Sequence, residues 1–440
     1  MWRLDAANAL LDQFGKAFVH LLAQPFYYIA VLFIIVQYTR QISLERRMFA
    51  VRLHIWPRLV AKAMLAGLAA GVIASIVGAF IGISLSGDAV LWLWGSAVVL
   101  LLFRIRYLCF AYGAGVLALL QWIIGFTPLE DNGGWIGDIA ASLAALDMPG
   151  ILVLVALLHL MEAFLVRRQG DKLATPLFLE GKRGKLVGGY MLQGFWPVPL
   201  FLLVPAAGGA SVVDLPWTPL SGSDWTQGWS VVALPMIIGF SEMTRTMLPK
   251  VKARHAAKRL LGYSLLLTGA ALLAWWQPAL LPIAALCSLL MHEVIIWRSR
   301  AIEAAQSPLY VNDQRGLRIL GIVPGTPADG MKLQAGEIIA KVNGSRVYSK
   351  EDLHEALQNS SAMYKLEVLN TDGELKFVQR ARYEGEHHQL GVILSPDERA
   401  TYYASSEPAT LLDLLRRSRT AKRRGGVYSE DEDRSGTLNV

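Results

Sequence analysis

The side chains best suited to buried chemistry are a histidine and a glutamate near the end of an apolar region. His292 and Glu293 begin the motif His-Glu-x-x-His, in which two imidazoles on one helix bind zinc and the glutamate acts as general base. Ile296 occupies the position of the second imidazole. His159 and Glu162 do not supply the pattern either. We therefore predict that the chain has no metal site and no cofactor.

Other catalytic patterns are missing from the sequence as well. The part after residue 300 has no serine, histidine and acid arranged as a nucleophile elbow. The two cysteines lie far apart in apolar stretches, where a thiol acts as a packing group. Glu162, Glu242 and Glu293 each lie within about two turns of a basic cluster, and Arg245 is a candidate partner of Glu242. These patterns predict no catalytic residues and a protein that is not an enzyme.

Turn chemistry outlines a small α+β domain between residues 307 and 394. Gly316 to Val323 alternates bulky apolar residues as a strand does, and the Pro-Gly-Thr-Pro turn that follows leads into a short helix over 328–333. Asn343 with Gly344 is a strong hairpin signal. Ser349 and Asp352 are spaced as a capping box. The remaining predicted elements are strands over 337–342, 365–369 and 375–381 and a helix over 350–359.

Two runs in this domain resemble the core of bacterial PDZ domains. They are Gly321-Ile-Val-Pro-Gly-Thr-Pro-Ala and Leu333-Gln-Ala-Gly-Glu-Ile-Ile-Ala-Lys-Val-Asn-Gly344. Gly330-Met331 and Glu337 depart from the usual Ala-Gly and Asp, but the turn and the apolar pattern survive. The resemblance implies that an extended peptide, often with a free carboxylate, adds as a strand to an exposed sheet edge.

Two segments are candidates for the loop that receives the peptide carboxylate. Arg315-Gly316-Leu317 precedes the first strand, whereas Gln389-Leu390-Gly391-Val392 resembles the hydrophobic-Gly-hydrophobic loop of PDZ domains in a permuted position. We favour the second, although it is alternatively only a closing strand. His354 either lines the groove or is a solvated surface residue. The candidate peptide-binding residues are Arg315, Gly316, Leu317, Arg318, Ile319, His354, Leu390, Gly391 and Val392.

The first 300 residues have the composition of a membrane protein. Hydrophobic residues make up 54% of the chain, and about 20 apolar residues cross a bilayer. We predict a polytopic α-helical membrane domain over 1–300 with about 8 or 9 helices, including a helical hairpin around Tyr190 to Trp196. Gly67, Gly71 and Gly78 predict close helix packing. The clearest apolar runs are 19–38, 63–85, 150–166, 264–276 and 280–297.

Charge places the loops on two sides of the membrane. The net charge is +7, but Lys and Arg cluster in loops that alternate with acidic loops free of them. Because basic loops stay in the cytosol, the C-terminal domain is expected on the cytosolic side of a bacterial cell membrane. The basic loops are expected to contact anionic lipids, and no nucleic acid partner is needed to explain them.

Residues 395–440 are expected to form a basic and largely disordered tail. Leu411 to Arg424 combines leucines with arginines, so it is either a helix on the anionic inner leaflet or a solvated segment. The apolar terminus at Val440 suggests a latch into a PDZ groove.

The whole chain resembles the MinJ family of cell-division topological determinants. The resemblance is carried by the many membrane spans, the early loop from Arg40 to His54, the single C-terminal PDZ domain and the closing run His388-Gln-Leu-Gly-Val-Ile393. It implies a scaffold at the division septum and poles that links DivIVA to MinC and MinD. The alternative is a regulatory or intramembrane protease-like protein whose PDZ domain presents substrates.

Overall fold

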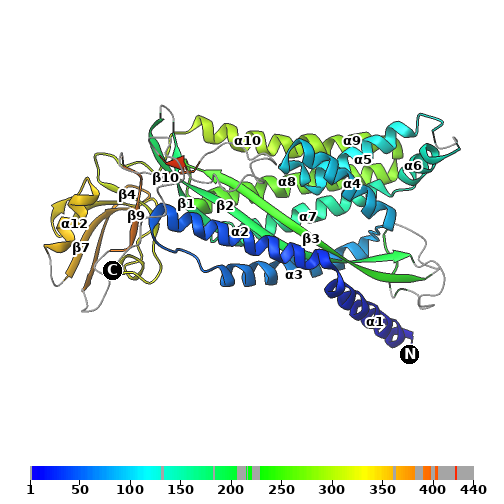
Figure 1. The fold of residues 1–440 in the computed structure, drawn as a ribbon, viewed down its shortest axis with the longest axis horizontal. Helices are drawn as coiled ribbons and strands as arrows, with labels where there is room; N and C mark the ends of the chain where they lie inside the picture. Colours follow the sequence, from blue (N-terminus) through cyan, green and yellow to red (C-terminus); the bar gives the residue numbers. More distant parts are fainter. Residues whose placement is uncertain are drawn as a thin grey trace, which may run out of the picture.

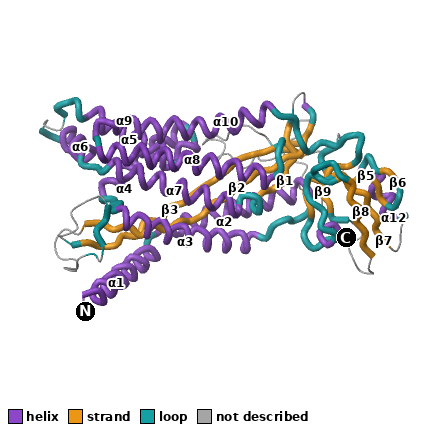
Figure 2. The backbone as a smooth tube through the Cα atoms, turned by 180° about the vertical axis from the view of Figure 1, so that it is seen from behind, coloured by secondary structure: helices purple, strands orange, loops and turns teal. Residues whose placement is uncertain are grey.

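The molecule is elongated, with a helical region along most of its length and the C-terminal α/β domain at one end (Figure 1). This computed structural model describes residues 2–129, 133–181, 184–205, 215, 217–220, 228–359, 363–381, 390–397, 402–404 and 422–423. Figure 2 shows the helices running roughly along the long axis, with α1 projecting at the end far from the C-terminal domain.

Five helical segments are long and apolar enough to cross a membrane, which confirms the predicted helical membrane class. They are α2 (Pro25–Phe49), α3 (Trp56–Ile81), α7 (Met148–Gln169), α8 (Pro249–Trp276) and the continuous segment Pro278–Ala305. The last segment comprises η3 (Pro278–Leu280), α9 (Leu281–Leu286), the π-helical turn η4 (Cys287–Met291) and α10 (His292–Ala305). The others are α1 (Trp2–Ala23), α4 (Gly87–Phe103), η1 (Ile105–Leu108), α5 (Phe110–Ile124) and α6 (Trp135–Ala144).

The helix ends follow local sequence signals. Proline stands in the first turn of α2, α3, α7 and α8, where a missing N–H costs no intrahelical bond. The side chains of Ser86 and Asp147 accept bonds from the first turns of α4 and α7. Gly82 ends α3 in the left-handed conformation. Helix α7 is the most buried of the long apolar helices and lies at the centre of the region.

The predicted helical hairpin around Tyr190 to Trp196 is wrong, because this part of the chain forms a sheet. The strands are β1 (Ala174–Glu180), β2 (Leu186–Pro205) and β3 (Trp229–Thr244), in the antiparallel order β1-β2-β3. β2 and β3 run alongside the helices for much of the molecule (Figure 1). Trp196 and Trp229 are fully buried within this sheet. The number of membrane-crossing helices, about 8 or 9, stays a prediction, although residues 186–205 and 229–244 form strands.

Proline removes outward-pointing backbone donors at two positions of β2. The backbone N–H of Phe201 points away from β3 and donates to Ser75 Oγ of α3 at 2.8 Å. Alternate residues of a strand point their N–H the same way, so positions 197 and 199 face the same direction. Both are proline, and Pro199 pairs with Pro235. The outward donors at these positions are therefore absent rather than unsatisfied.

The small residues of α3 pack against a strand, whereas the sequence suggested a neighbouring helix. A Cβ atom at Gly67 or Gly71 would overlap the carbonyl oxygen of Pro197 or Pro199, respectively. Only glycine allows α3 to approach the backbone of β2 this closely. The prediction of close packing is therefore right, and its partner is β2.

The C-terminal domain has the elements that its turn chemistry predicts. Asn343 and Gly344 both have positive φ in the tight turn after β5, and Ser349 with Asp352 forms a complete capping box on α12. The sheet order is β8-β7-β5-β4-β9, with β6 paired to β5. The elements are β4 (Leu317–Ile322), α11 (Pro327–Gly330), β5 (Ile338–Val342), β6 (Ser345–Arg346), α12 (Lys350–Gln358), β7 (Met363–Leu369), β8 (Leu375–Ala381) and β9 (Val392–Leu394).

Only short pieces of the chain beyond the C-terminal domain are described. β10 (Tyr402–Tyr403) pairs with β11 (Lys422–Arg423), and the N–H of Ala404 donates to Phe178 O of β1 at 2.8 Å. The predicted membrane-surface segment from Leu411 lies outside the described residues apart from β11. The proposed latch at Val440 lies outside them entirely.

Candidate peptide-binding site

The first candidate loop precedes an interior strand. β4 pairs with β5 through Leu317 and Arg318, and with β9 through Ile319. A strand with neighbours on both sides offers no edge to a peptide. Gly316 has φ +140° and lies against the carbonyl of Ile339, so it serves the close approach of the chain to β5. Arg315 is bound to Asp313 at 2.6 Å on the surface.

The second candidate loop leads into an edge strand. Among the described residues, β9 pairs with β4 on one side and with no strand on the other. The carbonyls of Leu390 and Gly391 accept bonds from Ala328 and Val323 at 2.9 Å each, which fixes the loop against α11. Gly391 has φ +83°, and a Cβ atom there would overlap Thr326. Both facts make glycine necessary at this position.

The apolar core of the domain includes residues of the loop, of β9 and of helix α12. Leu390 and Leu394 belong to one buried cluster with Leu353, Ala356 and Leu357 of α12. His354, by contrast, is exposed and its Nε2 lies 2.8 Å from Gln358 Nε2 of the same helix. Leu390 therefore belongs to the same domain core as the buried face of α12, Val392 packs against that core, and His354 lies on the helix at the surface.

The charged residues near β4 hold the domain together. Arg318 is buried, and its Nη1 donates to the carbonyl of Gly336 at 2.9 Å. Burial lowers the pKa of Arg318, and the nearby carboxylate of Asp313 opposes this. Hydrogen bonds from Arg315 lower the pKa of Asp313 below its usual range. These contacts give Arg315 and Arg318 structural partners within the domain.

The domain is fastened to the helical region through backbone and aromatic contacts. The N–H of Gly188 in β2 donates to Tyr310 O at 2.8 Å, and Tyr190 donates its hydroxyl proton to the carbonyl of Leu320. The rings of Tyr190 and Tyr310 lie 5.3 Å apart. Tyr310 and Leu320 belong to the same buried cluster as the helices. The position of the C-terminal domain at this end is thus fixed by β2.

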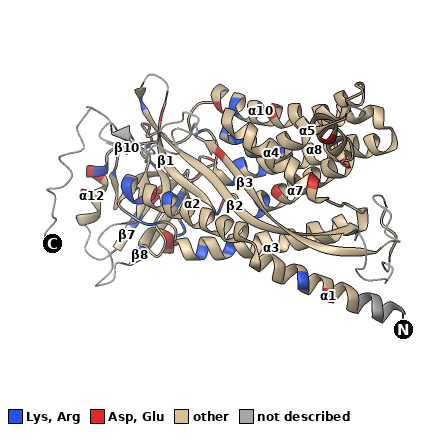
Figure 3. Cartoon of the chain, turned by 45° about the vertical axis from the view of Figure 1, so that its right-hand side comes forward, with Lys and Arg blue, Asp and Glu red and all other residues tan. Residues whose placement is uncertain are grey.

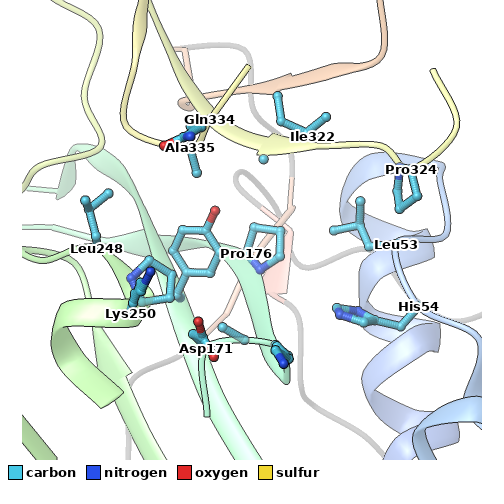
Figure 4. A pocket seen from close by; sticks show the side chains of 15 residues that line it. Leu53, His54, Asp171, Pro176, Leu248, Lys250, Ile322, Pro324, Gln334 and Ala335 are labelled. Atoms are coloured by element: carbon cyan, nitrogen blue, oxygen red, sulfur yellow. The ribbon is translucent and has the colours of Figure 1, made fainter. Parts of the chain in front are cut away.

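A cavity of about 390 Å³ lies at this boundary (Figure 4). Its walls come from Leu53 and His54 after α2, Asp171 after α7, Lys250 at the start of α8, and Ile322 of the C-terminal domain. Three of the predicted basic loops, over 40–62, 167–185 and 250–259, therefore contribute residues to a cavity that the C-terminal domain also lines. Figure 3 shows few charged residues in the half of the helical region that lies away from it.

The glutamates considered in the sequence have partners inside the helical region. Glu242 accepts bonds from Arg259 at 3.1 and 3.2 Å and lies 3.2 Å from Lys252 Nζ, so its partners differ from the predicted Arg245. Glu293 lies 2.9 Å from Arg106. The structural role of Glu162, Glu242 and Glu293 stays a prediction.

A second polar group was missed by the search for motifs within one helix. Cys109 lies between η1 and α5, His159 in α7 and His292 at the start of α10, yet their side chains meet. The sequence separates Cys109 from the two histidines by 50 and 183 residues. The only signal available was the presence of thiol and imidazole groups in apolar stretches.

Comparison with known proteins agrees with the two parts of the structure. A family model described as a PDZ domain matches residues 318–366. The cell division topological determinant MinJ of Bacillus subtilis (strain 168) is 36% identical over 261 residues. That match spans 58% of this chain and 64% of the relative, which is less than two thirds of its length. A probable cell division topological determinant MinJ of Lacticaseibacillus paracasei is 28% identical over 374 residues, covering 81% of this chain and 91% of the relative.

Proposed function

We propose that this MinJ-like chain is a non-enzymatic membrane scaffold that recruits protein partners through its PDZ domain during division-site selection. The observation that carries the proposal is the edge strand β9, preceded by the glycine loop Leu390-Gly391-Val392, on a domain fastened to apolar helices. The domain and the C-terminus would face the cytosol of a bacterial cell, at the division septum and poles.

The proposed binding mode is strand addition. An extended peptide pairs with β9 through its backbone, which supplies affinity with little dependence on sequence. Its carboxylate, or a carbonyl, lies against the loop at Gly391. Alternate side chains of the peptide then lie over the apolar floor formed by Leu390, Leu394 and the buried face of α12. Selectivity comes from that floor.

By resemblance, the proposed partners are DivIVA and MinD, with MinC acting through MinD. The relatives are named as cell division topological determinants, and a scaffold that joins a polar protein to a division inhibitor would restrict where the septum forms. Anionic lipids would contact the basic loops that gather near the C-terminal domain, and also the tail.

The alternative is an intramembrane protease-like protein, and one observation favours it. Cys109, His159 and His292 lie together among the helices, near Glu162. A zinc peptidase also needs a carboxylate placed to activate water. Glu162 Oε2 lies 3.9 Å from His159 Nε2, so it is the candidate for that role.

A cross-linking pull-down separates the two functions. The full-length chain, with a tag, is expressed in Bacillus subtilis cells that lack MinJ, and complexes are cross-linked before purification. We expect to recover DivIVA and MinD with the wild-type chain and with Gly373→Ala, and to lose them with Gly391→Ala. Equal recovery with Gly391→Ala would rule out the PDZ edge as the binding site. Enrichment of cleaved membrane peptides would instead support the protease.

A further inference from the structure

Three ligand atoms from separate parts of the chain converge inside the helical region. Cys109 Sγ lies 3.6 Å from His159 Nε2 and 3.7 Å from His292 Nε2, and all three atoms lie within 4.8 Å of one another. Cys109 precedes α5, His159 belongs to α7, and His292 begins α10. His159 is buried, and the other two are partly buried.

The hydrogen bonds on the far side of each imidazole fix its tautomer. His159 Nδ1 lies 2.8 Å from the carbonyl of Val155, which can only accept, so Nδ1 carries the proton. His292 Nδ1 lies 3.1 Å from the hydroxyl of Tyr112, which donates its own proton to Glu293 at 2.7 Å. His292 Nδ1 must therefore donate as well. Both Nε2 atoms present lone pairs towards Cys109.

These lone pairs are too many for the thiol alone. A neutral cysteine has one S–H proton, so it can donate to one of the two Nε2 atoms and leaves the other facing sulfur without a donor. A cation between the three atoms satisfies all of them. Metal-binding histidines commonly have this arrangement, with the second ring nitrogen bonded to a carbonyl or another polar partner.

The two sulfur–nitrogen separations fit zinc. Bonds of about 2.3 Å to sulfur and about 2.0 Å to nitrogen, meeting at a tetrahedral angle, place those two ligand atoms roughly 3.5 Å apart. The observed separations of 3.6 and 3.7 Å are close to this value. Thiolate and imidazole together are also a ligand set that suits zinc.

The surrounding helices hold the three residues in place. The π-helical turn η4 directly precedes His292, and such turns occur often at functional sites. Tyr263 donates to the carbonyl of Ser288 in that turn at 3.1 Å, and Ser288 Oγ donates to Ala111 at 2.8 Å. The ring of Tyr263 also lies 4.9 Å from that of His159.

We propose that Cys109, His159 and His292 bind a zinc-like divalent transition metal. Binding replaces the thiol proton, which leaves to solvent, and gives a thiolate and two neutral imidazoles as ligands. The fourth position is open to water or to Glu162, whose Oε2 lies 3.9 Å from His159 Nε2. The metal ties the start of α5 to α7 and α10. This site is independent of the PDZ edge and of any partner.

Metal content and cobalt spectra of the full-length chain in detergent test the proposal. The protein is supplied with Zn²⁺ or Co²⁺ and freed of excess metal. We expect one metal ion per chain, with the visible bands of tetrahedral Co²⁺ and a near-ultraviolet thiolate-to-cobalt band. Cys109→Ser, His159→Asn and His292→Asn should each lose these signals. The controls Cys287→Ser and His255→Asn, which change the other cysteine and an exposed histidine, should keep them.

Two further measurements remain informative if a ligand variant fails to fold. In the Cys287→Ser chain, Cys109 is the only thiol, so Zn²⁺ should slow its alkylation by a maleimide and a chelator should restore it. Tyr112→Phe removes the acceptor of His292 and should weaken metal affinity roughly 10- to 100-fold. A wild-type chain that binds no metal, an alkylation rate unaffected by Zn²⁺, or cobalt bands that persist in Cys109→Ser would overturn the proposal.

Discussion

Gly391 offers the sharpest test of how the candidate loop is built. In Gly391→Ala the new methyl group faces two costs. A left-handed conformation costs an L-residue about 1–2 kcal/mol, and overlap with a packed neighbour costs typically about 1–3 kcal/mol more. The overlap is with Thr326, whose side chain already donates to the carbonyl of Val323 at 2.6 Å. The loop and β9 should therefore open more often.

Gly373→Ala is the matched control for this change. Gly373 has φ +87°, against +83° for Gly391, but no atom lies within 4 Å of its added Cβ. Both variants replace a left-handed glycine by alanine, and only Gly391→Ala adds the overlap with Thr326. Amide hydrogen exchange of the full-length chain in nanodiscs measures opening of the segment 390–394. We expect it to exchange roughly 5- to 150-fold faster in Gly391→Ala than in Gly373→Ala. Equal exchange in the two variants would refute the argument that Thr326 and the loop are packed together.

Three other changes test the fold around the site. Gly67→Ala should lower the melting temperature of the detergent-solubilised chain, because its methyl overlaps a backbone oxygen at a cost of about 1–3 kcal/mol. The control Gly262→Ala adds a methyl group with no atom within 4 Å, so it should leave the melting temperature unchanged. Equal melting would contradict the packing of α3 on β2. Ser349→Ala removes the cap of α12 and should destabilise the PDZ domain by about 1 kcal/mol. The measurement is denaturant unfolding, monitored by hydrogen exchange of the α12 amides. An unchanged free energy of unfolding would show that the cap is dispensable. Arg315 lowers the pKa of Asp313 in the folded chain. The ionised carboxylate therefore stabilises the fold above the unfolded-state pKa of about 3.9. This stabilisation is lost as the pH falls through the folded-state pKa, which is lower. The stability difference between the wild type and Asp313→Asn should therefore shrink on acidification, and a difference that grows would contradict the assignment.

The PDZ domain could be predicted from sequence because its signals are local. Asn343-Gly344 and the box at Ser349 each fix a turn or a helix start within four residues, and the structure has both. The position of β9 beside β4 is a long-range pairing, so the sequence left two candidate loops open. The pairing of Ile319 with Leu394 places β4 inside the sheet.

The strands β2 and β3 were missed because a continuous apolar run does not distinguish a buried strand from a buried helix. Their length favoured a membrane helix. The evidence against a helix was the spacing of Pro197, Pro199 and Pro205 with Pro235 in the next run, since proline in a helix interior removes a bond and clashes with the preceding turn. Read as edge positions of a strand, the same prolines are favourable.

The meeting of Cys109 with His159 and His292 could not be found from spacing at all. The motif search required both imidazoles on one helix, whereas here the second comes from α7. Which helices lie side by side is decided by packing around α7 and β2. That packing depends on contacts such as those of Gly67 and Gly71, whose partner was itself mistaken.

The central claim is that the PDZ domain, held at the membrane, captures an extended peptide along β9. Hydrogen exchange of the full-length chain in nanodiscs, with and without purified MinD or DivIVA, tests it directly because strand addition protects backbone amides. The account predicts slower exchange across residues 390–394, with no change at β8, the opposite edge of the sheet. Protection confined to β8, or partner binding that leaves residues 390–394 unchanged, would contradict it.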